Sequence, residues 1–263
     1  MRRFLKILVW SVAGIVVLAM AAVAFLHTAP GGRLIASVAN SALSGPDMTV
    51  ELSPPKLGWG GDLRLDSVRV SDSEGPWLQV TGIDAKWHPL ALLGGRLSID
   101  SIGIAGVAVD RKPRPATSET EKETSSASVP ALPIDITLGK LQVREISLGS
   151  DIAGTPVRLT ADGSFAFDAA TMSLAANANI RRDDDKAGNL TATVGYLPET
   201  QSFKLDFSAS EPRGGLLARL LDVSELPALD VSLKGDGPLQ NWAADLAIAL
   251  DGVQTVTGKA GLT

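Results

Sequence analysis

An uncharged, mostly apolar stretch near the N-terminus is the longest hydrophobic run in the chain. It covers residues 7–26 and follows a basic tail, residues 1–6. Its length matches the ~20 residues that a helix needs to cross the ~30 Å hydrocarbon core of a bilayer. Basic residues stay on the cytoplasmic side of such a span. The pattern therefore predicts a cytoplasmic tail, a transmembrane signal-anchor over residues 7–27, and a body on the far side of the membrane.

A cleaved secretory signal is the alternative, because it also begins with basic residues and an apolar core. Such cores are ~7–15 residues long and end at a small-x-small site. Residues 22–24, Ala-Val-Ala, offer one such site, but bulky Phe25, Leu26 and His27 stand where cleavage is expected. The longer core favours the uncleaved signal-anchor.

A connector, residues 28–49, joins this segment to the rest of the chain. Pro30 and the two glycines that follow it break the apolar helix. Apolar residues then recur at roughly helical spacing, which predicts a short amphipathic helix. Its apolar positions are Leu34, Ile35, Val38, Ala39 and Leu43.

Beyond residue 50 the chain alternates apolar and polar residues, as a strand with one apolar face does. One pattern, apolar-x-apolar-x-x-apolar-x-apolar, occurs in four places. The two-residue spacer shifts the phase of the strand, and a bulge or bend there can return the apolar side chains to one face. The pattern therefore predicts bent strands in one sheet. The copies are Leu63, Leu65, Val68 and Val70; Leu78, Val80, Ile83 and Ala85; Leu97, Ile99, Ile102 and Ile104; and Leu141, Val143, Ile146 and Leu148.

Later segments alternate without the spacer, beginning with Met172 and Leu174. Short connections favour antiparallel neighbours, and no regular helix alternates with the strands. The sequence therefore predicts a mainly β fold: an N-terminal transmembrane helix followed by an elongated, curved antiparallel β-sheet, an open β-groove, with one or two short helices. The later strands are expected over 172–180, 190–196, 203–209, 229–233 and 246–250, and the short helices at 90–93 and 215–221.

A polar break, residues 113–133, divides the β-rich region. Thr, Ser, Glu and Lys dominate it, and this composition buries too little apolar surface to order itself. It predicts a flexible linker between a first β segment, residues 50–112, and a second, residues 134–263. The chain stops in the middle of the alternating pattern, so we expect the second segment to be truncated and the sequence to be part of a longer protein.

Composition excludes several classes of function. The net charge of −5 and the pI near 5.1 argue against a nucleic-acid partner. Cysteine is absent, so disulfides and thiolate chemistry are excluded. Aromatic residues make up only 5% of the chain, which suits a thin, extended sheet better than a compact core.

The sequence offers few candidate residues for catalysis or metal binding. The two histidines, His27 and His88, form no pair, and no nucleophile motif accompanies either. We therefore expect no catalytic, metal or cofactor site. Trp59, Trp77 and Trp87 cluster in the first β segment, where packing is the favoured interpretation; the alternative is an aromatic rim beside a lipid path.

Three consecutive segments carry a resemblance to a known family. They are the strand at 63–70, the acidic turn at 72–77 that ends in Gly-Pro-Trp, and the segment Trp-His-Pro-Leu-Ala-Leu-Leu-Gly-Gly-Arg-Leu at 87–97. In this order they resemble the N-terminal region of TamB-type proteins, subunits of the bacterial translocation and assembly module within the AsmA-like superfamily. The C-terminal domain that defines TamB-type proteins is missing from this sequence.

The resemblance implies an inner-membrane protein with a periplasmic β-groove. It implies a role in assembling outer-membrane proteins and autotransporters, or in moving phospholipid between membranes. Contact with the outer-membrane barrel TamA would require the missing C-terminal region. The alternatives are an AsmA-like protein of membrane homeostasis and, less favoured, an anchored periplasmic enzyme, for which no motif gathers polar residues in a pocket.

An apolar sheet face left uncovered would suit phospholipid acyl chains, because each buried CH₂ gains ~0.8 kcal/mol. An ordinary β core is the other interpretation of the same residues. The expected groove lining is Leu63, Leu65, Val68, Val70, Leu97, Ile99, Ile102, Ile104, Leu141, Val143, Ile146, Leu148, Met172 and Leu174.

Overall fold

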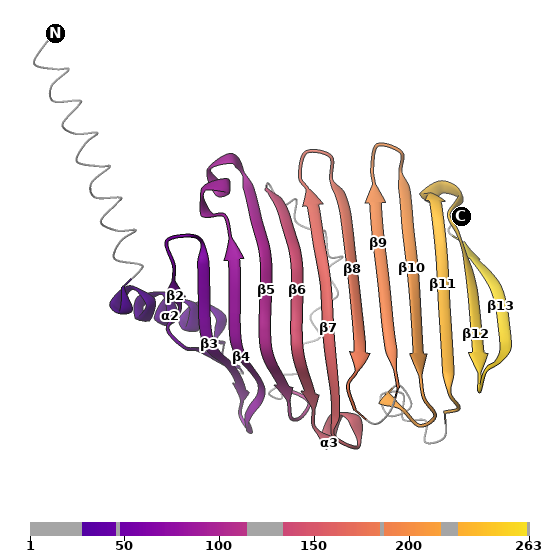
Figure 1. Cartoon of the computed structure of the whole chain (residues 1–263), viewed down its shortest axis with the longest axis horizontal. Helices are drawn as coiled ribbons and strands as arrows, with labels where there is room; N and C mark the ends of the chain where they lie inside the picture. Colours follow the sequence, from indigo (N-terminus) through magenta and orange to yellow (C-terminus); the bar gives the residue numbers. More distant parts are fainter. Residues whose placement is uncertain (1–27, 46–47, 115–133, 185–186, 217–225, 262–263) are drawn as a thin grey trace, which may run out of the picture.

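The computed structural model describes residues 28–45, 48–114, 134–184, 187–216 and 226–261, and they form a single open sheet (Figure 1). The sheet has 13 strands, and from β3 to β13 their spatial order is their order in the chain. At the N-terminal edge the short strands β1 (Thr49–Leu52) and β2 (Lys56–Leu57) both pair with β3. The mainly β fold with an open sheet is confirmed.

The remaining strands are long, and most connections between them are short. The strands are β3 (Asp62–Asp72), β4 (Gly75–Trp87), β5 (Arg96–Val109), β6 (Asp135–Leu148), β7 (Val157–Asp168), β8 (Ser173–Arg182), β9 (Asn189–Leu197), β10 (Ser202–Glu211), β11 (Leu229–Pro238), β12 (Ala243–Leu250) and β13 (Val253–Gly261).

One strand pair departs from the antiparallel arrangement that the sequence predicts. Strands β5 and β6 are parallel, with Arg96 opposite Asp135 and Val109 opposite Leu148. A parallel pair requires a connection that returns to the starting end of the sheet, and residues 110–134 supply it. The β segments on either side of the polar break are therefore direct neighbours in one sheet.

The two-residue spacers change which residues share a face. In an unbroken strand Leu65 and Val70 would point to opposite faces, because they are an odd number of residues apart. Both are nevertheless only 8% exposed. The pairing of β3 with β4 runs from Leu65 opposite Ile83 to Ser67 opposite Thr81, and Gly82 between them has φ 60°. The irregularity keeps the apolar side chains on the shielded side.

Helix α2 (Ala29–Leu43) protects the N-terminal edge of the sheet. Thr28 caps its first turn by accepting a hydrogen bond from the N–H of Gly31. The side chain of Asn40 accepts from the backbone N–H of Leu52 at 2.8 Å, and the Ser44 hydroxyl accepts from Val50 at 2.9 Å. These side chains satisfy edge groups of β1 that would otherwise invite another strand.

The whole predicted signal-anchor, residues 7–27, and most of the predicted helix at 215–221 lie outside the described residues. Among the described residues, no helix combines the length and apolarity that a membrane crossing requires. The other predicted short helix forms as a 3₁₀ turn, η1 (Pro89–Gly94). A further 3₁₀ turn, η2 (Leu239–Asn241), and a one-turn helix, α3 (Ser150–Ala153), complete the described elements.

The connections form two edges along the sheet. We call the edge that carries η1 and η2 the upper edge; it also holds residues 58–61, 169–172 and 198–201. The lower edge carries α3 and includes residues 73–74, 110–114 and 183–184 (Figure 1).

Candidate functional site

Apolar residues pair with apolar residues across the sheet. Residues opposite each other on neighbouring strands project to the same face, so a chain of such pairs forms a continuous row of side chains. One row, which we call the central apolar row, crosses every strand from β3 to β13 without a polar residue. It consists of Leu65, Ile83, Ile104, Val143, Ala161, Ile180, Leu190, Ala209, Val231, Ile248 and Val256.

Further rows flank the central apolar row, and all of them together make up what we call the apolar face. Toward the lower edge, one row passes through Val68, Val80, Val107, Ile146 and Leu159. Two more rows lie toward the upper edge. The next row passes through Ile102 and Leu141 to Phe207 and Leu233. The row beyond it includes Ile99, Leu138, Phe165, Ala176, Val194 and Leu205.

Most residues expected to line the groove are brought together by this register. Those on β5 and β6 meet in pairs, such as Ile102 with Leu141 and Ile104 with Val143. Leu174 stands between Phe167 and Tyr196. Met172 differs, because β8 begins at Ser173 and Met172 lies in the preceding turn with φ 57°.

The apolar face is shielded without being closed. Val143 and Leu65 are buried, whereas most of its other residues are half-buried. The described elements form a single layer, and α2 packs on β1 and β2 at one end (Figure 1). Within the described part of the chain, the apolar face therefore has no second layer of secondary structure against it.

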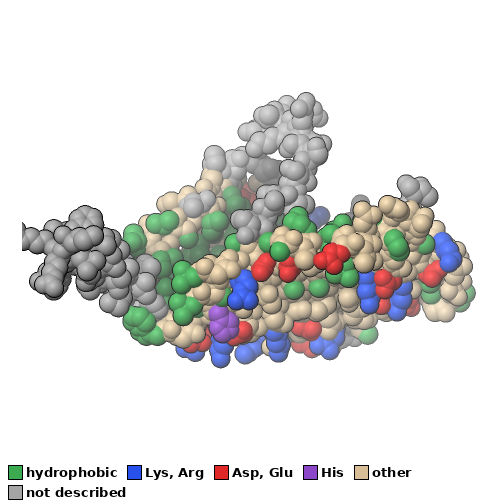
Figure 2. All heavy atoms as spheres, turned by 90° about the horizontal axis from the view of Figure 1, so that it is seen from above, with side chains coloured by type: hydrophobic (Ala, Val, Ile, Leu, Met, Phe, Trp, Pro, Cys, Tyr) green, Lys and Arg blue, Asp and Glu red, His purple; other side chains and the backbone are tan. Residues whose placement is uncertain are grey.

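The opposite face is polar. Figure 2 shows charged side chains gathered along one side of the molecule, viewed onto the upper edge. Next to the central apolar row, the neighbouring residues form a row on this other face. It consists of Arg64, Asp84, Gly103, Gln142, Asp162, Asn179, Thr191, Ser208, Ser232, Ala247 and Thr257.

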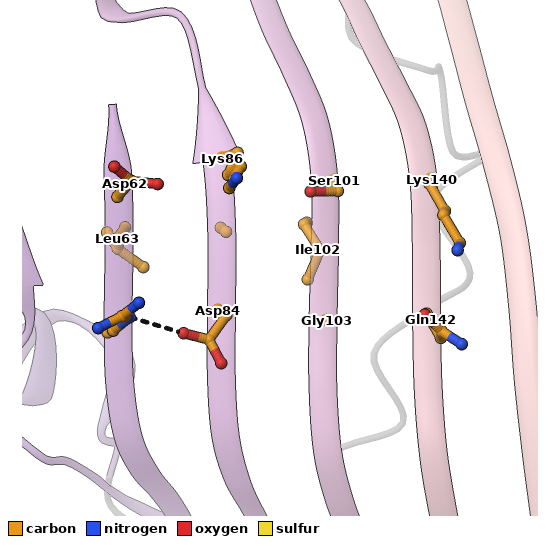
Figure 3. Close-up of a pocket in the computed structure, with 11 residues that line it drawn as sticks. Asp62, Leu63, Asp84, Lys86, Ser101, Ile102, Gly103, Lys140 and Gln142 are labelled. Carbon is orange, nitrogen blue, oxygen red and sulfur yellow. Dashed lines mark hydrogen bonds and ion pairs between the residues drawn. The ribbon is translucent and has the colours of Figure 1, made fainter. Parts of the chain in front are cut away.

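A hollow of about 470 Å³ lies on the polar face (Figure 3). Its lining includes Lys86, Lys140 and the ion pair between Arg64 Nε and Asp84 Oδ1, 3.0 Å apart. Both side chains of that pair are largely exposed, so water screens the charges. This lining suits hydrated ions rather than acyl chains.

One cation interrupts the apolar face near the lower edge. Arg182 is paired with Leu159 across the strands, and its side chain is only 7% exposed. Its guanidinium donates to both carboxylate oxygens of Asp184, at 2.7 and 3.0 Å, and lies 3.6 Å from Glu211 Oε1. The two carboxylates compensate the shielded positive charge and leave one negative charge in excess. A cavity of about 240 Å³ beside it is lined mainly by apolar side chains, among them Leu159, Ile180, Leu190, Ala209 and Leu216.

A second shielded ion pair ties the lower edge together near the N-terminal end. Arg111 donates to both oxygens of Asp72, at 2.5 and 2.8 Å, and to the carbonyl of Gly75. These bonds, with a further one from the backbone N–H of Arg114, hold the pKa of Asp72 well below its usual value. The same contact raises the pKa of Arg111. The pair joins the β3–β4 turn to the end of β5.

Other candidate residues do not form a chemical site in the described structure. His88 Nε2 lies 3.0 Å from Asp100 Oδ1 at an exposed position, and His27 lies outside the described residues. No group of three His, Cys, Asp or Glu side chains in the described ranges could hold a metal ion. Two of the predicted tryptophan cluster, Trp77 and Trp87, lie at opposite ends of β4, so the three do not form one cluster.

An open sheet with one continuous apolar face and one polar face defines a class of protein suited to extended apolar ligands. A family model described as YdbH-like, "Intermembrane phospholipid transport protein YdbH", matches residues 16–263, and the chain belongs to this family. The family is of the AsmA-like type, which confirms the resemblance at that level, while the TamB-type assignment remains a prediction. No curated protein and no solved structure gave a significant match.

Proposed function

We propose that this protein moves phospholipid between two membranes, with the acyl chains lying on the apolar face. The observation that carries the proposal is the central apolar row, which crosses the sheet from β3 to β13 without a polar interruption. Membership of a family described by intermembrane phospholipid transport supports the same function.

The dimensions of the apolar face suit a lipid path. Neighbouring strands lie ~4.8 Å apart, so the eleven strands crossed by the central apolar row extend over about 50 Å. This exceeds the ~30 Å thickness of the hydrocarbon core of a bilayer. Because each CH₂ kept from water gains ~0.8 kcal/mol, an acyl chain would remain on the face while it moves along it.

The proposed lining is larger than the set expected from the sequence. It keeps the predicted residues of β3, β5, β6 and β8, and it adds the neighbours that complete the rows. Those on β4 are Leu78, Val80, Ile83 and Ala85, and those on β7 are Leu159, Ala161, Phe165 and Phe167.

We further propose that residues 7–27 anchor the protein in the inner membrane by a single pass, with the body in the periplasm. The uncharged stretch and its basic flank support this placement, as does the intermembrane role of the family. The role is non-enzymatic, in line with a family described by lipid transport. Assembly of outer-membrane protein clients, with contact to TamA, remains a prediction from the TamB-type resemblance.

Lipid content of the purified protein tests the proposal. The full chain is expected to purify with bound phospholipid, detectable by mass spectrometry after extraction. Ile102→Asp places a charge on the apolar face and should remove most of this lipid. Ser101→Asp is the matched control, because Ser101 lies between Lys86 and Lys140 on the polar face. Equal lipid content in the two variants would contradict the proposal.

A further inference from the structure

Exposed hydrophobic side chains gather where β2, β3, β4 and β5 meet the upper edge. Trp59 is 74% exposed, Leu90 78% and Leu93 88%. Trp59 lies in the turn between β2 and β3, and the leucines lie in η1, between β4 and β5. We call these three residues the upper corner.

The upper corner is held in place by backbone contacts. The carbonyl of Gly61 accepts from the N–H of Trp87 at 3.0 Å, which joins the Trp59 turn to the end of β4. Gly61 has φ 83°, and a Cβ there would lie 1.8 Å from the Trp87 carbonyl oxygen. Leu90 and Leu93 are three residues apart in a 3₁₀ turn, so they project from the same side. These contacts therefore fix the positions of the exposed residues relative to one another.

The proposed lipid path does not use the upper corner. The rows of the apolar face end at Trp87 on β4 and at Leu97 on β5, whereas the residues of the upper corner lie in the turns beyond the strand ends. Exposed apolar patches on a folded protein mark sites of interaction. The upper corner is therefore a candidate docking surface separate from the lipid path.

The position of the upper corner indicates a bilayer as its partner. A Cβ on Gly32 of α2 would lie 2.5 Å from the carbonyl oxygen of Pro55, four residues before Trp59. At ~3.3 Å per residue, Trp59 lies within about 13 Å of Pro55, which itself packs against α2. The uncharged stretch at residues 7–26 leads directly into α2. Trp and Leu are also the residue types that enter the interfacial layer of a membrane.

We infer that the upper corner inserts into the surface of the bilayer beside α2, so that the N-terminal end of the sheet rests against the membrane. The lower edge near the same end carries Asp72, Glu74, Arg111 and Arg114, joined in ion pairs, and stays in water. The contact orients the sheet on the membrane, and it does not depend on lipid occupying the apolar face.

Site-specific labelling tests this inference, because the chain has no cysteine of its own. Leu93→Cys in the full chain is labelled with an environment-sensitive dye and reconstituted in vesicles of phosphatidylethanolamine and phosphatidylglycerol. Its emission should shift to shorter wavelength, and bromine-labelled acyl chains should quench it. Ser73→Cys, in the turn at the lower edge, is the control and should show neither effect. Equal responses at positions 93 and 73 would overturn the inference.

Two further measurements distinguish the bilayer from a second copy of the chain, and the upper corner from the lipid path. A wavelength shift at position 93 that needs no vesicles and grows with protein concentration would assign the surface to a second copy of the chain, and would also overturn the inference. The triple variant that adds Leu90→Ser and Leu93→Ser to dye-labelled Trp59→Cys should lose the bilayer quenching shown by Trp59→Cys alone. It should keep the phospholipid that purifies with it. Loss of that bound lipid together with retained quenching would contradict the separation of the two sites.

Discussion

The two faces of the sheet are made by the same strands and differ in nearly every row. The central apolar row holds only Leu, Ile, Val and Ala, whereas the adjacent row on the other face holds Arg, Asp, Asn, Gln, Thr, Ser, Gly and a single Ala. A polar face is stable in water without a partner. An apolar face this long contacts water unless a ligand or another surface covers it, and it is therefore the side on which we propose that lipid moves.

A charge introduced on each face should give the largest contrast. Val143→Asp places a carboxylate at a buried position on the apolar face and should lower the free energy of unfolding by at least about 3 kcal/mol. Thr137→Asp changes an exposed residue of the same strand and should cost no more than about 0.5 kcal/mol. Urea unfolding followed by circular dichroism measures both. Similar losses would mean that the two faces are equally exposed to water.

Removal of one arginine from each face should give the next largest contrast. Arg182→Leu leaves Asp184 and Glu211 without their cation in a shielded place, and should cost about 3 kcal/mol. Arg64→Leu removes one partner of the exposed pair with Asp84 and should cost less than about 1 kcal/mol. Thermal unfolding of both variants at neutral pH provides the comparison. A larger loss for Arg64→Leu would reverse the assignment of the faces.

Acid should reveal a smaller difference between shielded and exposed ion pairs. The pKa of Asp72 is lowered in the folded protein, so its pairing with Arg111 contributes full stability above the unfolded pKa, about 4. That contribution is lost as the pH falls through the lower folded value. Asp72→Asn should therefore be less stable than the native chain at pH 7, and the difference should shrink below about pH 4.

The exposed pair of Lys56 with Asp66 is the control for this effect. Asp66→Asn should alter the melting temperature little at either pH, because both side chains are in water. A difference for Asp72→Asn that grows as the pH falls would contradict the pairing.

The alternation along the chain was sufficient to predict strands with one apolar side, because a two-residue period survives whatever the strand order. The two-residue spacer between Leu65 and Val68 likewise predicted a bulge or bend, because a local irregularity is needed to keep the apolar side chains on one face when the phase changes within a strand. Strand β7 was missed because small residues, including Ala161 and Gly163, fill the middle of its apolar side and weaken the pattern before Phe165.

Strand direction and long-range pairing could not be predicted from the sequence. Alternation is the same in parallel and antiparallel strands, so the parallel pair of β5 and β6 left no signal. The ion-pair partners of Arg182 could not be predicted from the sequence either. Asp184 is local, but Glu211 comes from β10 and meets Arg182 only after the register of two strand pairs is set. The separation of Trp77 from Trp87 follows from the length of β4, which the composition does not reveal.

Photo-crosslinking on a single strand tests directly whether phospholipid lies on the apolar face. A photoreactive amino acid at Leu174 would lie on the apolar face, between Phe167 and Tyr196, and one at Asn177 would lie on the polar face beside Ser164. In cells, we expect phospholipid to be captured at Leu174, and also at Ile99, with little or none at Asn177. Capture at Asn177 equal to that at Leu174, or no lipid at either apolar position, would contradict lipid binding on the apolar face.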